Sequence, residues 1–174
     1  MIVDRPSSHF VFVVPEDHVY RRYNYINHDG KPLTNKEYLE SWGKWLVFDT
    51  AKELADLARL LDPFVEARDV PAIKYDRQKI EEFGLDRCVM CIYCHIARRD
   101  AVWDILVSVG VQQKAWAFER ETLERWQPGG ANLERWIEGR KLSPQQADVV
   151  RRQAEAQFKH LFGNEDAIFT GIEQ

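Results

Sequence analysis

Short runs rich in β-branched and aromatic residues recur along the chain and predict the strands of a sheet. The clearest runs are residues 9–14, 44–48 and 88–95, and shorter candidates lie at 70–75, 114–118 and 167–170. Residues 18–26, which include three tyrosines, predict either a further strand or an aromatic-rich loop. Asp29 and Gly30 follow, and this pair of residue types predicts a turn.

Helices are predicted where apolar residues recur every three or four positions. Thr50 and Glu53 have the spacing of a capping box at the start of the clearest helix, which has leucines along one face. Ser143 is the N-cap of the last predicted helix, with Pro144 at its first position, and we expect this helix to span about 143–162. Other helices are predicted at residues 34–42, 98–109, 121–126 and 131–138.

Strands and helices are interspersed, without an internal repeat or a low-complexity linker between them. This arrangement predicts an α+β fold with a single, mostly antiparallel sheet and helices packed on one face. The 174 residues are enough for one domain that buries a hydrophobic core without disulfide bonds. We therefore expect a single domain over residues 1–174.

Composition and charge narrow the class of protein further. Hydrophobic residues make up 45% of the chain and charged residues 30%, as in ordinary globular proteins. The net charge of −4 argues against general nucleic-acid binding, although a local basic groove stays open. No signal peptide or membrane span is visible, and an odd number of cysteines, three, is unusual for a secreted disulfide scaffold. We expect a cytoplasmic protein with no membrane partner.

All three cysteines lie in the run 88–95 and show two metal-site spacings. Cys91 and Cys94 with His95 match the C-x-x-C-H haem attachment motif, and Cys88 extends the spacing to that of iron–sulfur ligands. The run has no turn residue, however, and side chains three apart in a strand face opposite sides. We therefore predict a buried strand with no metal and no cofactor. A metal or redox site on these four residues is the alternative.

Cys91 and His95 share one face of this predicted strand, which allows a thiolate–imidazole pair. A catalytic nucleophile also needs an oriented base and an oxyanion site. The sequence offers no candidate for either, so we predict no catalytic residue and do not expect an enzyme.

The six tryptophans suggest a binding site. Trp45, Trp103 and Trp116 lie on predicted strand or helix faces and are expected in the core. The others lie near predicted loops, where indole rings can stack on a nucleobase while basic residues contact phosphates. The ligand-binding site that we predict combines two loop tryptophans with three basic residues: Trp42, Trp126, Arg98, Arg99 and Lys114.

The order of segments within residues 43–118 resembles the basophilic leukaemia-expressed protein family. That family has a G-K-W-L strand, a helix, a short strand ending in a lysine, and a V-I-C-V-Y-T strand before another helix. The corresponding segments here are Gly43-Lys-Trp-Leu-Val-Phe48, residues 50–61, Pro71-Ala-Ile-Lys-Tyr75, Arg87-Cys-Val-Met-Cys-Ile-Tyr-Cys-His95 and residues 98–109. The family is similar in fold to the mRNA cap-binding initiation factor, a curved antiparallel sheet backed by helices. In that factor, two tryptophans hold the base between them.

Together, these features favour a binding module for a nucleotide-like or RNA-end ligand. The cysteine-ligated metal or redox site is the first alternative. A protein-interaction domain without a small-molecule site is the second, and exposed aromatic patches would indicate it.

We expect the purified protein to hold no stoichiometric zinc or iron, because cysteines three apart in a strand cannot converge on one ion. Elemental analysis and an absorption spectrum, on protein purified without a metal-affinity column, measure this directly. One equivalent of metal, or a Soret band, would instead identify the cysteines as the functional site.

Overall fold

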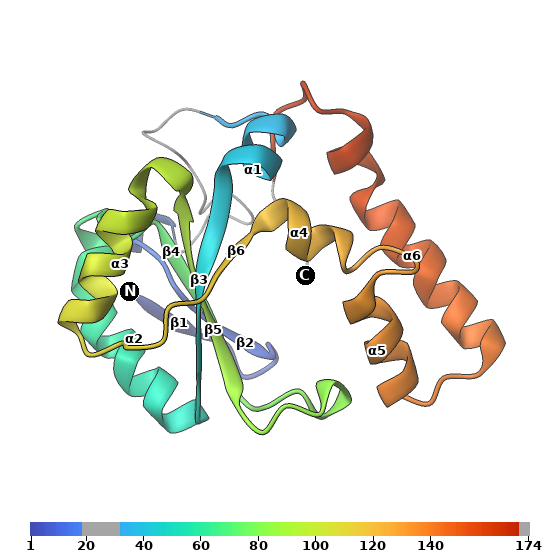
Figure 1. Cartoon of the computed structure of the whole chain (residues 1–174), viewed down its shortest axis with the longest axis horizontal. Coiled ribbons are helices and arrows are strands. Elements are labelled where there is room, and N and C mark those ends of the chain that lie inside the picture. The colour runs from blue at the N-terminus through green and yellow to red at the C-terminus, as the bar shows by residue number, and fades with distance from the viewer. Residues whose placement is uncertain (19–31, 171–174) are drawn as a thin grey trace.

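The computed structural model describes residues 1–18 and 32–170, which form an α+β fold around one open sheet (Figure 1). The described strands follow one another across the sheet in this order: β1 (Ile2–Asp4), β2 (Phe10–Val13), β4 (Ala72–Asp76), β5 (Cys88–His95), β3 (Trp42–Asp49) and β6 (Trp116–Phe118). Every neighbouring pair is antiparallel. The predicted α+β class with a single antiparallel sheet is therefore confirmed.

Helices connect these strands and form the C-terminal third of the chain. They are α1 (Asn35–Ser41), α2 (Ala51–Glu66), α3 (Arg99–Ser108), α4 (Glu119–Glu124), α5 (Ala131–Gly139) and α6 (Pro144–Gly163), with the 3₁₀ helices η1 (Glu16–His18), η2 (Glu81–Phe83) and η3 (Ile96–Arg98). As predicted, the Thr50 hydroxyl accepts a hydrogen bond from the Glu53 amide, and the Ser143 hydroxyl accepts one from the Gln146 amide. Among the described helices, none has the length and apolarity that a bilayer span requires.

The structure corrects two predictions and adds one strand. Residues 167–170 do not form a closing strand, since an isolated bridge from Ile168 to Thr34 is their only β-pairing with described residues. Trp42 does not end a helix beside a loop: α1 ends at Ser41, and Trp42 begins β3. Strand β1, which no sequence pattern predicted, pairs with β2. Residues 19–26 and the Asp29-Gly30 turn lie outside the described residues.

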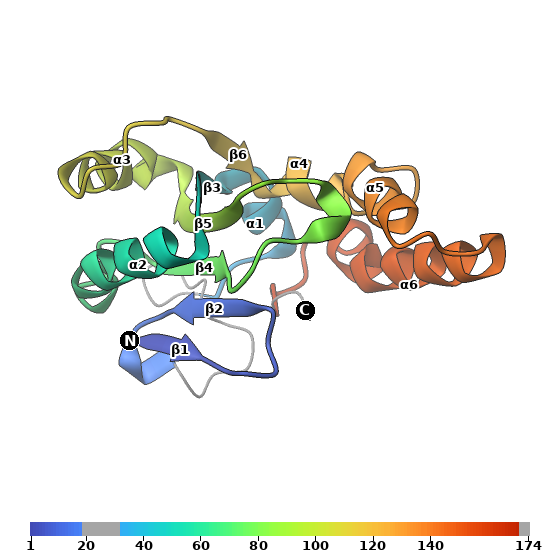
Figure 2. The ribbon, with the colours of Figure 1, turned by 90° about the horizontal axis from the view of Figure 1, so that it is seen from below.

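The main hydrophobic core lies between the sheet and the helix pair α2 and α3. Met90 and Ile92 project into it from alternate positions of β5, and Leu54 and Leu106 join them from the two helices. All four side chains are fully buried. Burial of each such side chain favours folding by about 1.5–3 kcal/mol. Figures 1 and 2 show α2 and α3 on one side of the molecule, with α5 and α6 on the other.

A second group of helices packs at one end of the opposite sheet face. Tyr38 of α1, Leu123 of α4 and Leu161 of α6 form one apolar cluster with Trp42 and Tyr93 of the sheet. A third apolar cluster joins α5 to α6. Helices thus contact both faces of the sheet. The prediction of helices on one face holds for α2 and α3, and packing of helices against the other face was not predicted.

We expect Gly43→Ala to lower the free energy of unfolding by about 1–3 kcal/mol, the usual cost of overpacking a core. A Cβ atom at this position of β3 would meet the Trp116 ring and come within 2.7 Å of the Ala117 carbonyl oxygen on β6. Chemical denaturation measures the change. Gly163→Ala is the control, because no atom lies within 4 Å of the added Cβ there. Equal stability of both variants would contradict the close packing of β3 on β6.

Candidate functional site

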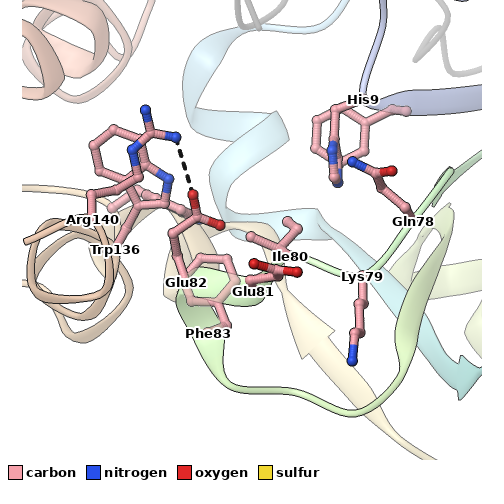
Figure 3. A pocket seen from close by; sticks show the side chains of 11 residues that line it. His9, Gln78, Lys79, Ile80, Glu81, Glu82, Phe83, Trp136 and Arg140 are labelled. Carbon is pink, nitrogen blue, oxygen red and sulfur yellow. Dashed lines mark hydrogen bonds and ion pairs between the residues drawn. The ribbon is translucent and has the colours of Figure 1, made fainter.

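A cavity of about 720 Å³ opens where the start of β2, residues 78–83 and the α4–α5 region meet (Figure 3). Four aromatic residues line it, and they come from three separate parts of the chain: Phe10, Phe83, Trp126 and Trp136. Figure 3 shows Trp136 and Arg140 on one side of the cavity and His9 and Gln78 on the other. The size and the aromatic lining are those of a small-molecule site.

The cavity depends on the close approach of α5 to η2. A Cβ atom on Gly139 would lie 2.5 Å from the Glu82 carbonyl oxygen, so this contact requires glycine. The Trp126 ring packs edge-on against Phe83, with 5.6 Å between the ring centroids. These contacts place the segment before α5 and the end of that helix against residues 81–83. The lining residues of η2, Trp126 and the end of α5 are therefore held in place by tertiary packing.

A second set of contacts holds α5 against α6. The Arg151 guanidinium of α6 donates two hydrogen bonds to the Glu134 carboxylate, at 2.9 and 2.6 Å. This bidentate pairing, together with the Gly129 amide, lowers the pKa of Glu134 to about 2. Glu134 thus stays ionised across the neutral range and fixes the helix that carries Trp136.

Charged groups at the cavity differ in how they are paired. The Arg140 guanidinium donates to Glu82 at 3.1 Å and lies over the Trp136 ring, 5.2 Å from its centroid. A hydrogen bond from its own backbone amide, and then the bond from Arg140, hold the pKa of Glu82 below its ordinary value. Lys79 and Glu81 are exposed, and neither forms an ion pair with any residue that the structure describes. They are the groups that remain available to a charged or polar ligand.

A buried polar network crosses the sheet face opposite α2 and α3. The Lys44 ammonium of β3 donates to Glu119 at 2.6 Å, and the Tyr38 hydroxyl donates to the other oxygen of that carboxylate at 2.5 Å. Lys44 is 6% exposed and Glu119 is 3% exposed. Burial alone raises the pKa of Glu119, but the Lys44 ammonium and the two hydrogen bonds outweigh burial and lower it overall. The network thus keeps a buried carboxylate ionised and ties α1 and α4 to the sheet.

The predicted ligand-binding residues do not come together in one place. Trp126 lines the cavity, whereas Trp42 is only 1% exposed and lies in the cluster beneath α1, so its ring has no face open to a ligand. Arg98 donates to the Asp69 carbonyl oxygen at 3.3 Å, and Arg99 donates to the carboxylate of its neighbour in α3. The Lys114 ammonium lies over the Trp45 and Trp103 rings, at 5.6 and 5.4 Å from their centroids.

The cavity contains residues that the sequence did not indicate. Trp136 is one of the loop tryptophans, but no local pattern connects it with Phe10 or Phe83, which lie far away along the chain. Lys79 lies in a short segment between β4 and η2 that has no distinctive motif. The sequence does contain one local signal. The Pro128-Gly129-Gly130 turn separates the two short predicted helices that contain Trp126 and Trp136.

The cysteines follow the alternation of the strand. Cys88 and Cys94 face the main core, and Cys91 faces the opposite cluster. All three are free thiols, and burial raises the pKa of Cys94 to about 12 and also raises the pKa of Cys91. A protonated thiol is a poor nucleophile and metal ligand. Within residues 1–18 and 32–170, no three His, Cys, Asp or Glu side chains are grouped as a metal site requires.

Comparison with models of known protein families, with characterised proteins and with solved structures finds no match for this chain. The resemblance to the basophilic leukaemia-expressed protein family therefore stays a prediction.

We expect Glu119→Gln to lower the free energy of unfolding by about 3–5 kcal/mol, because it leaves the Lys44 ammonium buried without a counter-charge. Chemical denaturation at pH 7 measures the loss. Glu121→Gln, on an exposed position of the same helix, should change stability by less than about 0.5 kcal/mol.

The same pair of proteins should differ less in acid. The pKa of Glu119 is lower in the folded chain than its ordinary value of 4.5, so the carboxylate stabilises the fold fully above pH 4.5. That contribution is lost as the pH falls through the folded-state pKa. A stability gap between wild type and Glu119→Gln that stayed constant down to pH 3 would contradict the ionised pair.

Proposed function

We propose that this protein is a binding module for a nucleotide-like ligand, held in the cavity between β2, residues 78–83 and α5. The observation that carries the proposal is the convergence of four aromatic rings on one cavity, at whose edge Lys79 and Glu81 have no ion-pair partner among the described residues. Aromatic side chains stack on any base, with about 1–3 kcal/mol for each base.

The charges at the edge of the cavity suit the polar parts of such a ligand. The Lys79 ammonium is available to a phosphate group, and the Glu81 carboxylate is available to an exocyclic amino group of a base. Trp136 is half-buried between Arg140 and the apolar cluster that joins α5 to α6, and the part that lines the cavity would contact a planar ring. A mononucleotide or an RNA end is of the right size for a cavity of about 720 Å³.

The net charge limits how long the ligand is. Binding to an extended nucleic acid depends on many lysine and arginine contacts with phosphates. This chain has a net charge of −4, and the described cavity has Lys79 as its one unpaired cation. These features favour a single nucleotide or the end of a chain. The predicted resemblance to a family similar in fold to the cap-binding initiation factor favours the same class of ligand.

We expect mononucleotides to quench the tryptophan fluorescence, and Trp136→Leu to weaken binding by about tenfold or more, because a stacking partner is lost. A panel of the four ribonucleoside monophosphates and a methylated cap analogue, titrated with correction for nucleotide absorption, measures both effects. Trp126→Phe should retain most of the affinity, since it keeps an aromatic ring.

Trp103→Leu is the matched control, because this tryptophan belongs to α3, packs against the main core and does not line the cavity. Its loss should leave nucleotide affinity unchanged. The proposal fails if no nucleotide is bound, or if Trp103→Leu and Trp136→Leu weaken binding equally.

A further inference from the structure

His9 lines the cavity and is also in contact with the buried end of β4. Its Nε2 nitrogen is buried and lies 3.5 Å from the Asp76 carboxylate. Asp76 is directly opposite Phe10 in the pairing of β2 with β4, and the Arg77 amide donates a hydrogen bond to the His9 carbonyl oxygen at 3.0 Å. The sheet therefore fixes the backbone of His9 against β4, with its side chain at the edge of the cavity.

The two ring nitrogens of His9 have different surroundings. Nε2 faces the carboxylate, whereas Nδ1 has no hydrogen-bond partner among the described residues and is open to solvent. The His9 side chain is 34% exposed, and the Asp76 side chain is 8% exposed. The carboxylate is therefore closed to a ligand, and Nδ1 is the polar atom of this pair that a ligand in the cavity is able to reach.

The charge of His9 acts on two carboxylates. Burial raises the pKa of Asp76, although the Val89 amide and the charge of His9 oppose this. At Glu82 of η2, the hydrogen bonds from its own backbone amide and from Arg140 lower the pKa, and the charge of His9 adds a smaller effect. Asp76 is the ion-pair partner of His9 within the described part of the chain. The other charged residues of the surrounding segments are Lys74, Arg77, Lys79 and Glu81.

His9 lies at the polar side of the cavity. Figure 3 shows it beside Gln78, across the cavity from Trp136. Gln78 is exposed, and its amide forms no hydrogen bond with any residue that the structure describes. Lys79, the next residue along the chain, adds a cation at this edge. A nucleotide whose base stacks on Trp136 would therefore extend its sugar and phosphate toward these side chains.

We propose that the ligand is a nucleoside phosphate and that protonated His9, together with Gln78, binds its phosphate group. This inference rests on the proposed function and adds to it the class of ligand and a dependence on pH. The phosphate supplies acceptors for both side chains, and a hydrogen bond from a charged donor is the stronger kind.

The protonation state of His9 decides whether a phosphate is attracted or repelled. A neutral imidazole has one N–H donor and one acceptor nitrogen. Beside the Asp76 carboxylate, Nε2 is the nitrogen that carries the proton, so Nδ1 of the neutral ring is an acceptor and repels a phosphate oxygen. Protonation converts Nδ1 into a charged donor. Histidine side chains change charge between about pH 5 and 8, so phosphate binding should strengthen in mild acid.

The test is a fluorescence titration of the full chain with adenosine monophosphate and with adenosine, between pH 8 and pH 6. We expect affinity for the monophosphate to rise by about fivefold or more over this range, because a charged donor replaces an acceptor. Affinity for adenosine should stay constant, since it has no phosphate. The phosphate itself loses negative charge only near pH 6, and that change would weaken binding and not strengthen it.

Three variants test the residues. His9→Gln keeps a neutral polar side chain and should bind the monophosphate at pH 6 about as weakly as wild type does at pH 8. His160→Gln is the matched control, because His160 is exposed on α6 and does not line the cavity, and it should keep the wild-type profile. Asp76→Asn should shift the rise to lower pH, since the carboxylate that stabilises the imidazolium is lost. Circular dichroism verifies that each variant is folded.

Each outcome bears on the proposal. A rise in monophosphate affinity that His9→Gln abolishes and His160→Gln retains supports it. Equal pH profiles for the monophosphate and adenosine, or a rise that His9→Gln leaves unchanged, would overturn it while nucleotide binding in the cavity stands. An unshifted profile in Asp76→Asn would overturn the role of the ion pair. If neither ligand binds at any pH, the proposed function fails, and this inference fails with it.

Discussion

The buried ion pair between Lys44 and Glu119 is the interaction on which the arrangement of the helices depends. Lys44 belongs to β3, which lies between β5 and the edge strand β6, and Glu119 is the first residue of α4. Tyr38 brings α1 to the same carboxylate. A buried charge whose partner is displaced is strongly unfavourable, so these three groups allow one placement of α1 and α4 on the sheet. Apolar contacts alone are much less directional.

The cavity is a consequence of that placement. The short connection from α4 to α5 contains Trp126, and α5 then packs against η2 at Gly139 and against α6 through the Glu134–Arg151 pair. Each step restricts the next, from the sheet to α4, to α5 and finally to the cavity lining. The fold therefore presents rigid aromatic surfaces, which lose little conformational freedom when a planar ligand binds.

The two faces of the sheet have different chemistry because strand alternation separates them. One face is filled by α2 and α3 and holds only apolar side chains from β5, including Cys88 and Cys94. The other holds Lys44, Lys74 and Cys91 among aromatic rings. Charged groups in an apolar setting interact strongly with any ion that enters, since little water screens them. This is the physical basis for expecting ligands on the second face and not on the first.

Much of the secondary structure could be predicted from the sequence, because the signals are local. Thr50 and Ser143 cap their helices through hydrogen bonds to amides three residues away, and the cysteines of β5 face opposite sides because a strand alternates. The surroundings of individual side chains could not be predicted in the same way. Trp42 precedes a glycine and was predicted to lie near a loop, yet side chains of α1, α4 and α6 bury it.

The ligand-binding features depend on pairs that are distant along the chain. Lys44 and Glu119 are 75 residues apart, and the rings of Phe10 and Trp136 reach one cavity from distant parts of the chain. No periodicity or spacing in the sequence predicts such contacts, since they result from the order of the strands and the packing of the helices. The sequence by itself determined the strands from β2 to β6, the starts of the capped helices and the faces of β5. Only the tertiary structure decided which charges pair and which tryptophans are buried, because both depend on contacts between distant parts of the chain.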